Sequence, residues 1–264
     1  MMHRELDRST IFGMQIHCVT MDQAISCLYG WIVEEERSCR YVVTPNLDHA
    51  LQHQENPALR DAYGSASLVL ADGWPLVTAS RFFHNPLPER VAGADLVPEL
   101  FRFLHQSQSG GTAFLLGAAP GVADVAARRI EHQWSRVEVV GTYSPPFGFE
   151  NDPQETDHTV EQINACNPDV LVVGLGAPRQ ELWLKKFHED LSVGVAIAAG
   201  ATIDFLAGRQ TRAPVWVQKI RMEWFHRCLT NPGRLTGRYL RNAWNLPGLV
   251  LQEHRCRRNK DAAH

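Results

Sequence analysis

Runs of branched and aromatic apolar residues alternate along the chain with segments in which apolar residues recur every three or four positions. Six such runs, each ending in a small or polar turn, lie at 41–46, 67–73, 112–121, 137–146, 169–178 and 193–202. Helix-like segments lie between them at 47–65, 94–106, 120–133, 157–167 and 179–190. Continuous apolar strands that alternate with helices predict a mostly parallel sheet with helices on both faces, a Rossmann-like α/β fold.

The two ends of the chain depart from this alternation. Thr20 and Gln23 are spaced as in a capping box, which predicts a helix beginning after residue 20. After residue 212 the strand pattern stops, and we expect one helix over 213–229 and a second that begins at Asn231-Pro232 and ends at Pro247-Gly248. The chain therefore divides into an α/β domain over 1–212 and a helical appendage over 213–264.

Composition excludes several classes of protein. The hydrophobic share, 44% of 264 residues, is ordinary for a soluble globular protein. No run reaches the roughly 20 apolar residues of a membrane span, and the N-terminus lacks the apolar core of a signal peptide. The six cysteines contain no CxxC pair. We therefore expect a cytoplasmic protein with reduced thiols and no zinc site.

Charge distinguishes the appendage from the rest of the chain. Residues 209–258 hold eleven Lys/Arg and two Asp/Glu, a balance of +9, with three of the seven tryptophans, whereas the remaining residues carry −12. Arginines interleaved with Trp, Tyr and Leu suit an anionic membrane surface, although a solvated basic face has the same composition. An RNA-binding appendage would use the same charge, but no nucleic-acid-binding module is recognisable, so we expect no nucleic-acid partner.

Two glycine-rich turns open directly from strands into helices. One contains Gly117, and the other contains Gly176 and Pro178. Backbone N–H groups at a helix start attract phosphate, so the two turns together can hold a nucleotide sugar, while each alone also fits an ordinary tight turn. Gln180 follows the second turn and can bond a nucleotide or sugar hydroxyl. Arg179 replaces the third glycine of a dinucleotide fingerprint, which argues against NAD.

Polar side chains follow two other strands. Thr44 and Asn46 can hold substrate or cap the next helix. Asp72 can accept a proton or form a turn, and Arg90 precedes a turn of small residues. The chain contains no DxD pair. We therefore expect no metal and no cofactor, with arginines and helix N-termini bearing the charge of a leaving diphosphate.

The order of these motifs resembles the WecG/TagA/CpsF family of bacterial glycosyltransferases (family 26), over about residues 10 to 245. The stretches that carry the resemblance are TPNLDHA, LADGWPLV, RVAGADL, GAPRQELW, GATIDFLAG with RAPVW, and EWFHRCLTNPGR. The resemblance implies inverting, metal-independent transfer of a glucose or N-acetylmannosamine type of sugar from a UDP-sugar. The implied acceptor is a polyprenyl-diphosphate-linked glycan of exopolysaccharide or cell-envelope synthesis, at the inner face of the cell membrane.

The resemblance also implies residue roles. Asp72 corresponds to the catalytic base, Thr44 and Asn46 to the pair that positions substrate, Arg90 to a pocket arginine and Gln180 to a donor contact. The appendage is implied to dock on the membrane and close over the donor.

Three arginines of the appendage are candidate diphosphate contacts. Arg227 and Arg234 fall where the family's arginines are thought to reach the diphosphate. The family often has a further arginine three residues after Arg234, and here Gly237 holds that position with Arg238 beside it.

Two alternative functions stay open at this stage. A nucleotide-binding regulator would bind UDP without transferring sugar, and an NAD-dependent oxidoreductase would need an irregular fingerprint. The apolar helix faces also allow self-association into a homo-oligomer.

Overall fold

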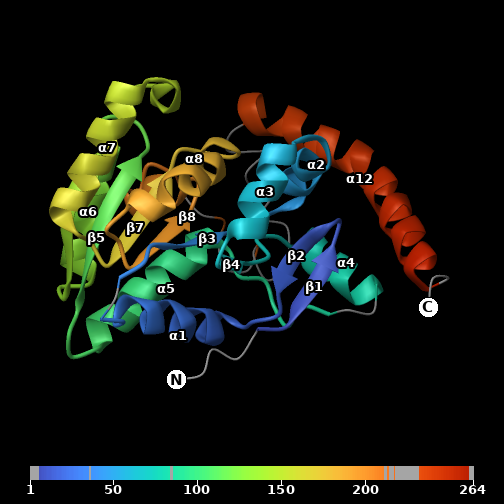
Figure 1. Cartoon of the computed structure of the whole chain (residues 1–264), viewed down its shortest axis with the longest axis horizontal. Coiled ribbons are helices and arrows are strands. Elements are labelled where there is room, and N and C mark those ends of the chain that lie inside the picture. Colours follow the sequence, from blue (N-terminus) through green and yellow to red (C-terminus); the bar gives the residue numbers. More distant parts are fainter. Residues whose placement is uncertain are drawn as a thin grey trace.

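The computed structural model describes residues 6–35, 37–83, 86–210, 213, 217 and 232–261. Six strands form one sheet in the order β4-β3-β8-β7-β5-β6, and every neighbouring pair is parallel (Figure 1). Their bounds are β3 (Arg40–Val43), β4 (Leu68–Val69), β5 (Gly111–Gly117), β6 (Val137–Tyr143), β7 (Val170–Gly174) and β8 (Val195–Ala198). All six apolar runs therefore form strands, and the predicted parallel α/β fold is confirmed.

Helices cover both faces of the sheet. One face packs against α1 (Met21–Ile32), α5 (Gly93–Gln106), α6 (Val122–Gln133) and α9 (Thr202–Leu206). The other packs against α2 (Leu47–Glu55), α3 (Pro57–Ser65), α7 (Pro153–Cys166) and α8 (Arg179–Phe187), with short 3-10 turns at η1 (Phe149–Asn151) and η2 (His188–Asp190). The capping box predicted at Thr20 and Gln23 begins α1.

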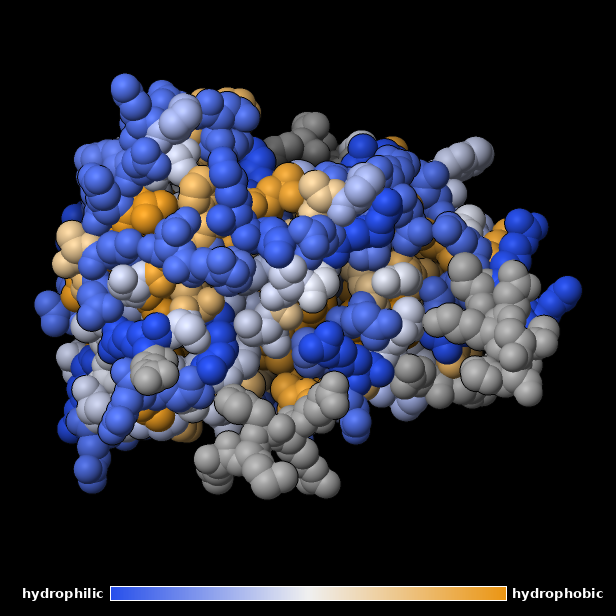
Figure 2. Space-filling view, viewed as in Figure 1, coloured by the Kyte–Doolittle hydropathy of each residue, from blue (hydrophilic) through white to orange (hydrophobic). Residues whose placement is uncertain are grey.

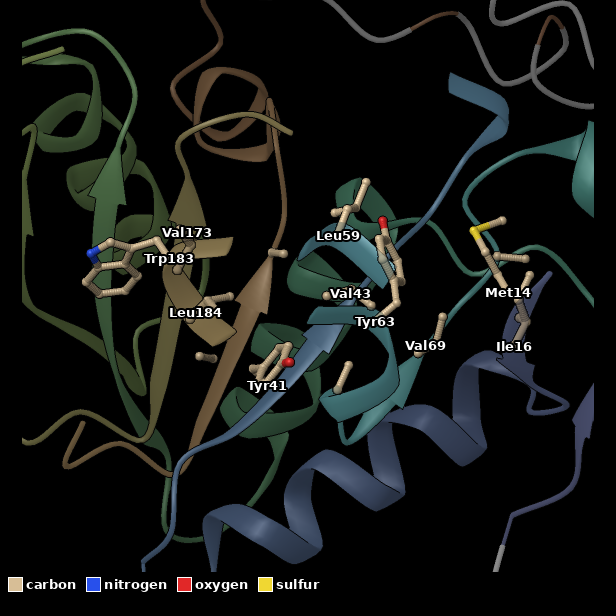
Figure 3. Packing of buried hydrophobic residues seen from close by; sticks show 14 of the residues in the cluster. Met14, Ile16, Tyr41, Val43, Leu59, Tyr63, Val69, Val173, Trp183 and Leu184 are labelled. Atoms are coloured by element: carbon tan, nitrogen blue, oxygen red, sulfur yellow. The ribbon is translucent and has the colours of Figure 1, made fainter. Parts of the chain in front are cut away.

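Strand residues alternate between the two cores because successive side chains point to opposite faces. Tyr41 and Val43 of β3 join the core under α3 and α8, whereas Val42 joins the opposite core. Figure 3 shows Tyr63 of α3 close to Val43 of β3, and Trp183 of α8 beside β7. The parallel sheet, with a core on each face, is thus the buried middle layer.

Hydrophobic side chains that reach the surface form small separate patches among hydrophilic ones in the view of Figure 2.

The segment 47–65, predicted as one helical segment, forms two helices in the structure. Asn56 has an extended backbone, ends α2 and caps α3 by accepting the N–H of Leu59. Pro57 causes the break, since a proline disfavours helical geometry at the residue before it and has no N–H to donate. The structure also contains a helix and a hairpin that the sequence patterns did not predict: α4 (Trp74–Phe82), β1 (Arg8–Ile11) and β2 (Met14–His17).

The last helix, α12 (Pro232–Asp261), continues past Pro247-Gly248, where the sequence predicted its end. Pro247 cannot donate to the carbonyl of Ala243, but both residues are exposed, so water can satisfy that carbonyl. The part beyond Pro247 is anchored by Arg257, which donates to the carbonyls of Thr10 and Phe83, and by buried Leu249. The helix predicted over 213–229 lies outside the described residues.

α12 runs along the side of the α/β domain, past α2 toward β1 and α4 (Figure 1). Arg241 forms an ion pair with Asp48 of α2 at 3.1 Å, and Gln252 donates to Gln54 at 3.1 Å. The appendage helix is therefore fastened to the domain at both halves of its length. None of the helices in the described ranges combines the length and the apolar character needed to cross a membrane.

Candidate active site

The carboxyl ends of the parallel strands lie along one edge of the sheet, and the residues singled out in the sequence gather there. Asp72 follows β4, Thr44 and Asn46 follow β3, Gly117 ends β5, and Gly176 follows β7. In the observed strand order Asp72 lies three strands away from Gly176, roughly 14 Å at the usual strand spacing. The edge therefore offers separate places to the two ends of an extended ligand such as a nucleotide sugar.

Hydrogen bonds between neighbouring strand ends fix the Asp72 side of the edge. The Asp72 N–H donates to the carbonyl of Pro45 at 2.8 Å. The buried Thr44 hydroxyl donates to the carbonyl of Ala198 at 3.3 Å, so β3 is tied to β8 beyond the end of the ladder. Gly73 then turns the chain into α4 with φ of +145°, a conformation that side-chain-bearing residues rarely adopt. Asp72 thus lies at a sharp turn, with its side chain partly exposed to solvent.

Asn46 caps α2 in this structure. Its side-chain oxygen accepts the N–H groups of Asp48 at 2.9 Å and His49 at 3.3 Å. The cap engages only the oxygen of the amide, and the amide nitrogen is the atom of Asn46 that can contact a substrate. Asn46 therefore caps the helix, as one of its two expected roles requires. Its contact with substrate stays a prediction, which the cap does not prevent.

Arg90 is held between two carboxylates. The Val91 N–H donates to the carbonyl of Ala71 at 2.9 Å, which brings the loop before α5 alongside Asp72. One guanidinium nitrogen of Arg90 lies 3.5 Å from Asp72, and the other donates to Asp95 at 2.6 Å. Asp95, in the first turn of α5, is therefore part of the charged cluster. Helical pairing at three or four residues does not apply to these two residues, because Arg90 precedes α5 and Asp95 lies in its first turn.

The glycine turns differ in why they need glycine. A Cβ on Gly117 would lie 2.6 Å from the carbonyl oxygen of Gly174, so close packing of β5 on β7 excludes any side chain there. Gly176 instead has φ of +79°, and a Cβ added to it would meet no described atom within 4 Å. Close packing and a φ of +105° account for Gly117 without a ligand, whereas the space over Gly176 also suits the approach of a ligand. Pro178 follows and precedes the first residue of α8.

Gln180 is almost fully buried, and its amide joins two strand ends. Its oxygen accepts the N–H groups of Gly176 and Gly200, each at 3.2 Å. Its nitrogen donates to the carboxylate of Glu181 at 3.0 Å. The structure therefore places Gln180 in the framework of the β7 and β8 turns, and its direct contact with a donor stays a prediction. Glu181 was missed in the sequence because nothing local distinguishes it from an ordinary helix residue.

The appendage arginines are described only in part. Arg227 lies outside the described residues, and Arg234 and Arg238 fall within α12 where the backbone alone is described. Among the described residues, no group of three or more His, Cys, Asp or Glu side chains has the arrangement of a metal site. At the Asp72 end of the described edge, Arg90 meets two carboxylates, those of Asp72 and Asp95.

Comparisons with known proteins identify the family of the chain. The model of the family described as "Glycosyl transferase WecG/TagA/CpsF family" matches residues 9–260. A protein of Bacillus spizizenii named N-acetylglucosaminyldiphosphoundecaprenol N-acetyl-beta-D-mannosaminyltransferase is 31% identical over 194 residues, which cover 74% of this chain and 72% of that protein. A Staphylococcus aureus protein of the same name is 27% identical over 228 residues, or 85% of each chain. The chain therefore belongs to the WecG/TagA/CpsF family of glycosyl transferases.

Proposed function

We propose that this glycosyl transferase moves a sugar, of the N-acetylmannosamine or glucose type, from a UDP-sugar to a glycan linked to undecaprenyl diphosphate. The observation that carries the proposal is the Asp72–Arg90 pair at the carboxyl edge of the sheet, beside the ends of β3 and β8. The names of the two relatives support a sugar linked to polyprenyl diphosphate as the acceptor and N-acetylmannosamine as the first donor sugar to test.

The proposed reaction is one displacement at the anomeric carbon. The acceptor hydroxyl oxygen forms the new bond, the bond to the UDP oxygen breaks, and Asp72 takes the hydroxyl proton. General-base assistance of this kind contributes roughly 10²–10⁴ in rate. The relatives' names specify a β product, which a single inverting displacement yields from a donor whose diphosphate lies on the α face. Thr44 and Asn46 lie next to Asp72 and are assigned to positioning the substrate.

Negative charge on the departing diphosphate is assigned to backbone N–H groups and arginines rather than to a metal ion. Gly176 is suited to this role because the space over it is open among the described residues and α8 begins three residues later. Arg227, Arg234 and Arg238 of the appendage are proposed to add positive charge when the appendage closes over the donor. Donors that act on developing charge lower the barrier and do not merely bind substrate.

Residues 213–264 are proposed to attach the enzyme to the anionic inner surface of the cell membrane. The described part of α12 has two opposite faces. Asn242, Leu249 and Glu253 are buried on one face, whereas Leu240 and Trp244 are 66% and 86% exposed on the other. Exposed apolar and basic side chains recur on that outer face, at Leu240, Trp244, Leu251, Arg255 and Arg258. A lipid surface with anionic headgroups complements such a face.

A donor screen tests the proposed function. Purified protein would be incubated with UDP-N-acetylmannosamine, UDP-N-acetylglucosamine or UDP-glucose and a short-chain prenyl-diphosphate-linked N-acetylglucosamine, and UDP release would be measured. We expect acceptor-dependent release with one donor and a β-linked product by NMR. An α-linked product would contradict inversion. Binding of UDP without any transfer would contradict the enzyme and favour a nucleotide-binding regulator.

A further inference from the structure

Glu181 is a buried carboxylate with no exposed surface, in the first turn of α8. One of its oxygens accepts the Gln180 amide nitrogen at 3.0 Å, and the other has no hydrogen-bond partner among the described residues. Burying an ionisable oxygen without a partner costs on the order of 1–3 kcal/mol or more. A carboxylate at this position is therefore unfavourable for stability by itself, and its only described hydrogen bond is the one to Gln180.

The neighbouring amide has two orientations, and only one satisfies its surroundings. The N–H groups of Gly176 and Gly200 both point at the Gln180 side-chain oxygen and are donors. If the amide were turned over, its NH₂ group would face those two donors, and its oxygen would face the Glu181 carboxylate. A carboxylate can only accept, so Glu181 excludes the turned-over amide by repulsion between oxygens.

The correct orientation connects the turns after β7 and β8. Gln180 also donates its own backbone N–H to the carbonyl of Gly176 at 3.1 Å, which closes the turn on itself. A Cβ on Gly174 would lie 3.0 Å from the carbonyl oxygen of Gly200, so the two turns touch directly. The single Gln180 oxygen thus sets the spacing of two adjacent turns at the edge that faces the ligand.

The charge of Glu181 acts on Tyr63 of α3. Burial raises the pKa of the Tyr63 hydroxyl well above its usual value, and the negative charge of Glu181 raises it further. Tyr63 stays neutral as a result, and its hydroxyl pairs with Nδ1 of His49 at 3.0 Å. Helix α3, which packs against α8, therefore carries a neutral and already hydrogen-bonded hydroxyl near Glu181, and the described hydrogen bond of Glu181 is the one from Gln180.

We propose that Glu181 is a positioning residue for donor binding: it fixes the orientation of the Gln180 amide and thereby the spacing of the Gly176 and Gly200 turns that receive the nucleotide diphosphate. The inference rests on the proposed UDP-sugar function. It predicts that loss of Glu181 raises the KM for donor and leaves the KM for acceptor nearly unchanged, because the acceptor is assigned to the Asp72 side of the edge.

The test compares two substitutions of similar size. Glu181→Met removes the acceptor and should raise the donor KM about tenfold, the value of one charge-assisted hydrogen bond. Glu181→Gln keeps an acceptor oxygen but can also donate, so it no longer excludes the turned-over amide, and its donor KM should lie between those of wild type and Glu181→Met. Glu161→Met, on the exposed face of α7, is the matched control for surface substitution. All assays would run well below each variant's melting temperature.

A double variant separates positioning from a general structural role. If Glu181 acts through Gln180, adding Glu181→Met to Gln180→Met should leave the donor KM of the Gln180→Met variant unchanged. An independent tenfold increase, or an unchanged donor KM in folded Glu181→Met, would overturn the inference. If Glu181→Met does not fold, Glu181→Asp is tested in its place. Aspartate keeps the charge and places the carboxylate one methylene farther from the Gln180 amide. That variant should raise the donor KM about threefold, and an unchanged value would refute the inference.

The outcomes for Glu181 and for the proposed function are distinguishable. Absence of transfer by the wild-type enzyme with every UDP-sugar would remove the proposed function before any variant is compared. Transfer by wild type with no change in donor KM for Glu181→Met removes only the role of Glu181.

Discussion

Arg90 approaches Asp72 with one guanidinium nitrogen at 3.5 Å, while Asp95 holds the other at 2.6 Å. The closer partner is thus the carboxylate that does not carry the proposed chemistry. Asp95 anchors the arginine at the N-terminus of α5, and Asp72 keeps a longer, weaker contact and a partly exposed side chain. This arrangement leaves Asp72 near a cation with about a third of its side chain exposed to solvent, which suits the base role proposed for it.

Asp72→Asn should abolish most turnover and preserve donor binding. The amide matches the shape of the carboxylate but cannot take a proton, so kcat should fall roughly 10²–10⁴-fold. UDP-sugar affinity, measured by calorimetry, should change little because the diphosphate is assigned to the opposite part of the edge. Near-normal turnover would remove Asp72 as the base.

Arg90→Lys should lower kcat/KM about 10–100-fold, because a single ammonium cannot reach two carboxylates with the fixed fork of a guanidinium. Steady-state kinetics measure the effect. Arg102→Lys is the matched control, since Arg102 is an exposed arginine on α5 that pairs only with Glu99 among the described residues. Equal effects of the two substitutions would contradict a specific role for Arg90.

Stability should fall as pH decreases from about 6.5 toward 4. Burial, reinforced by Arg8, lowers the pKa of His17 to about 4, and burial with Arg60 does the same for the pKa of His53. Both are neutral when folded, whereas the unfolded chain takes up protons near pH 6.5, so the unfolded state binds more protons across this window and folding weakens.

Urea unfolding at pH 7.5, 6 and 5 measures this decline. His17→Gln combined with His53→Gln should flatten the dependence on pH, whatever it does to absolute stability. His132→Gln, at an exposed position of α6, should leave the slope unchanged. A slope in the double variant equal to that of wild type would show that other groups dominate.

Transfer should persist after dialysis against EDTA. If backbone N–H groups and arginines carry the charge of the leaving diphosphate, removing divalent ions should change kcat by less than about twofold. UDP release with and without added Mg²⁺ is the measurement. Loss of activity with EDTA and recovery with Mg²⁺ would end the metal-independent proposal.

Replacing Leu240, Trp244 and Leu251 by serine should release the protein from anionic vesicles. These side chains are exposed and lie on the side of α12 opposite its buried residues, so the fold should persist. Co-sedimentation with phosphatidylglycerol vesicles measures binding, and Val125→Ser on α6 is the control for a lost exposed apolar group. Undiminished binding by the triple variant would exclude this face as the attachment site.

The six strands and most of the helices could be predicted because their signals are local. A strand buried on both faces must be apolar at every position, and a turn must follow where it ends. Asp72, Thr44, Asn46 and the Gly176 turn were identified in the same way, since they stand at predicted strand ends. The break at Pro57 is also local and was missed. The hairpin β1–β2 and α4 were missed because their short segments carry weak patterns.

The local sequence pattern thus determined which elements form and which polar residues lie at strand ends. Only the tertiary structure decided their neighbours. The strand order places β8 between β3 and β7. This order brings Gly200 to Gln180, and it brings Ala198 to Thr44, which is more than a hundred residues away in the sequence. The continuation of α12 past Pro247 depends in the same way on anchors at Thr10 and Phe83. Such contacts join segments distant in sequence, and their energies appear only when the sheet order has brought the segments together.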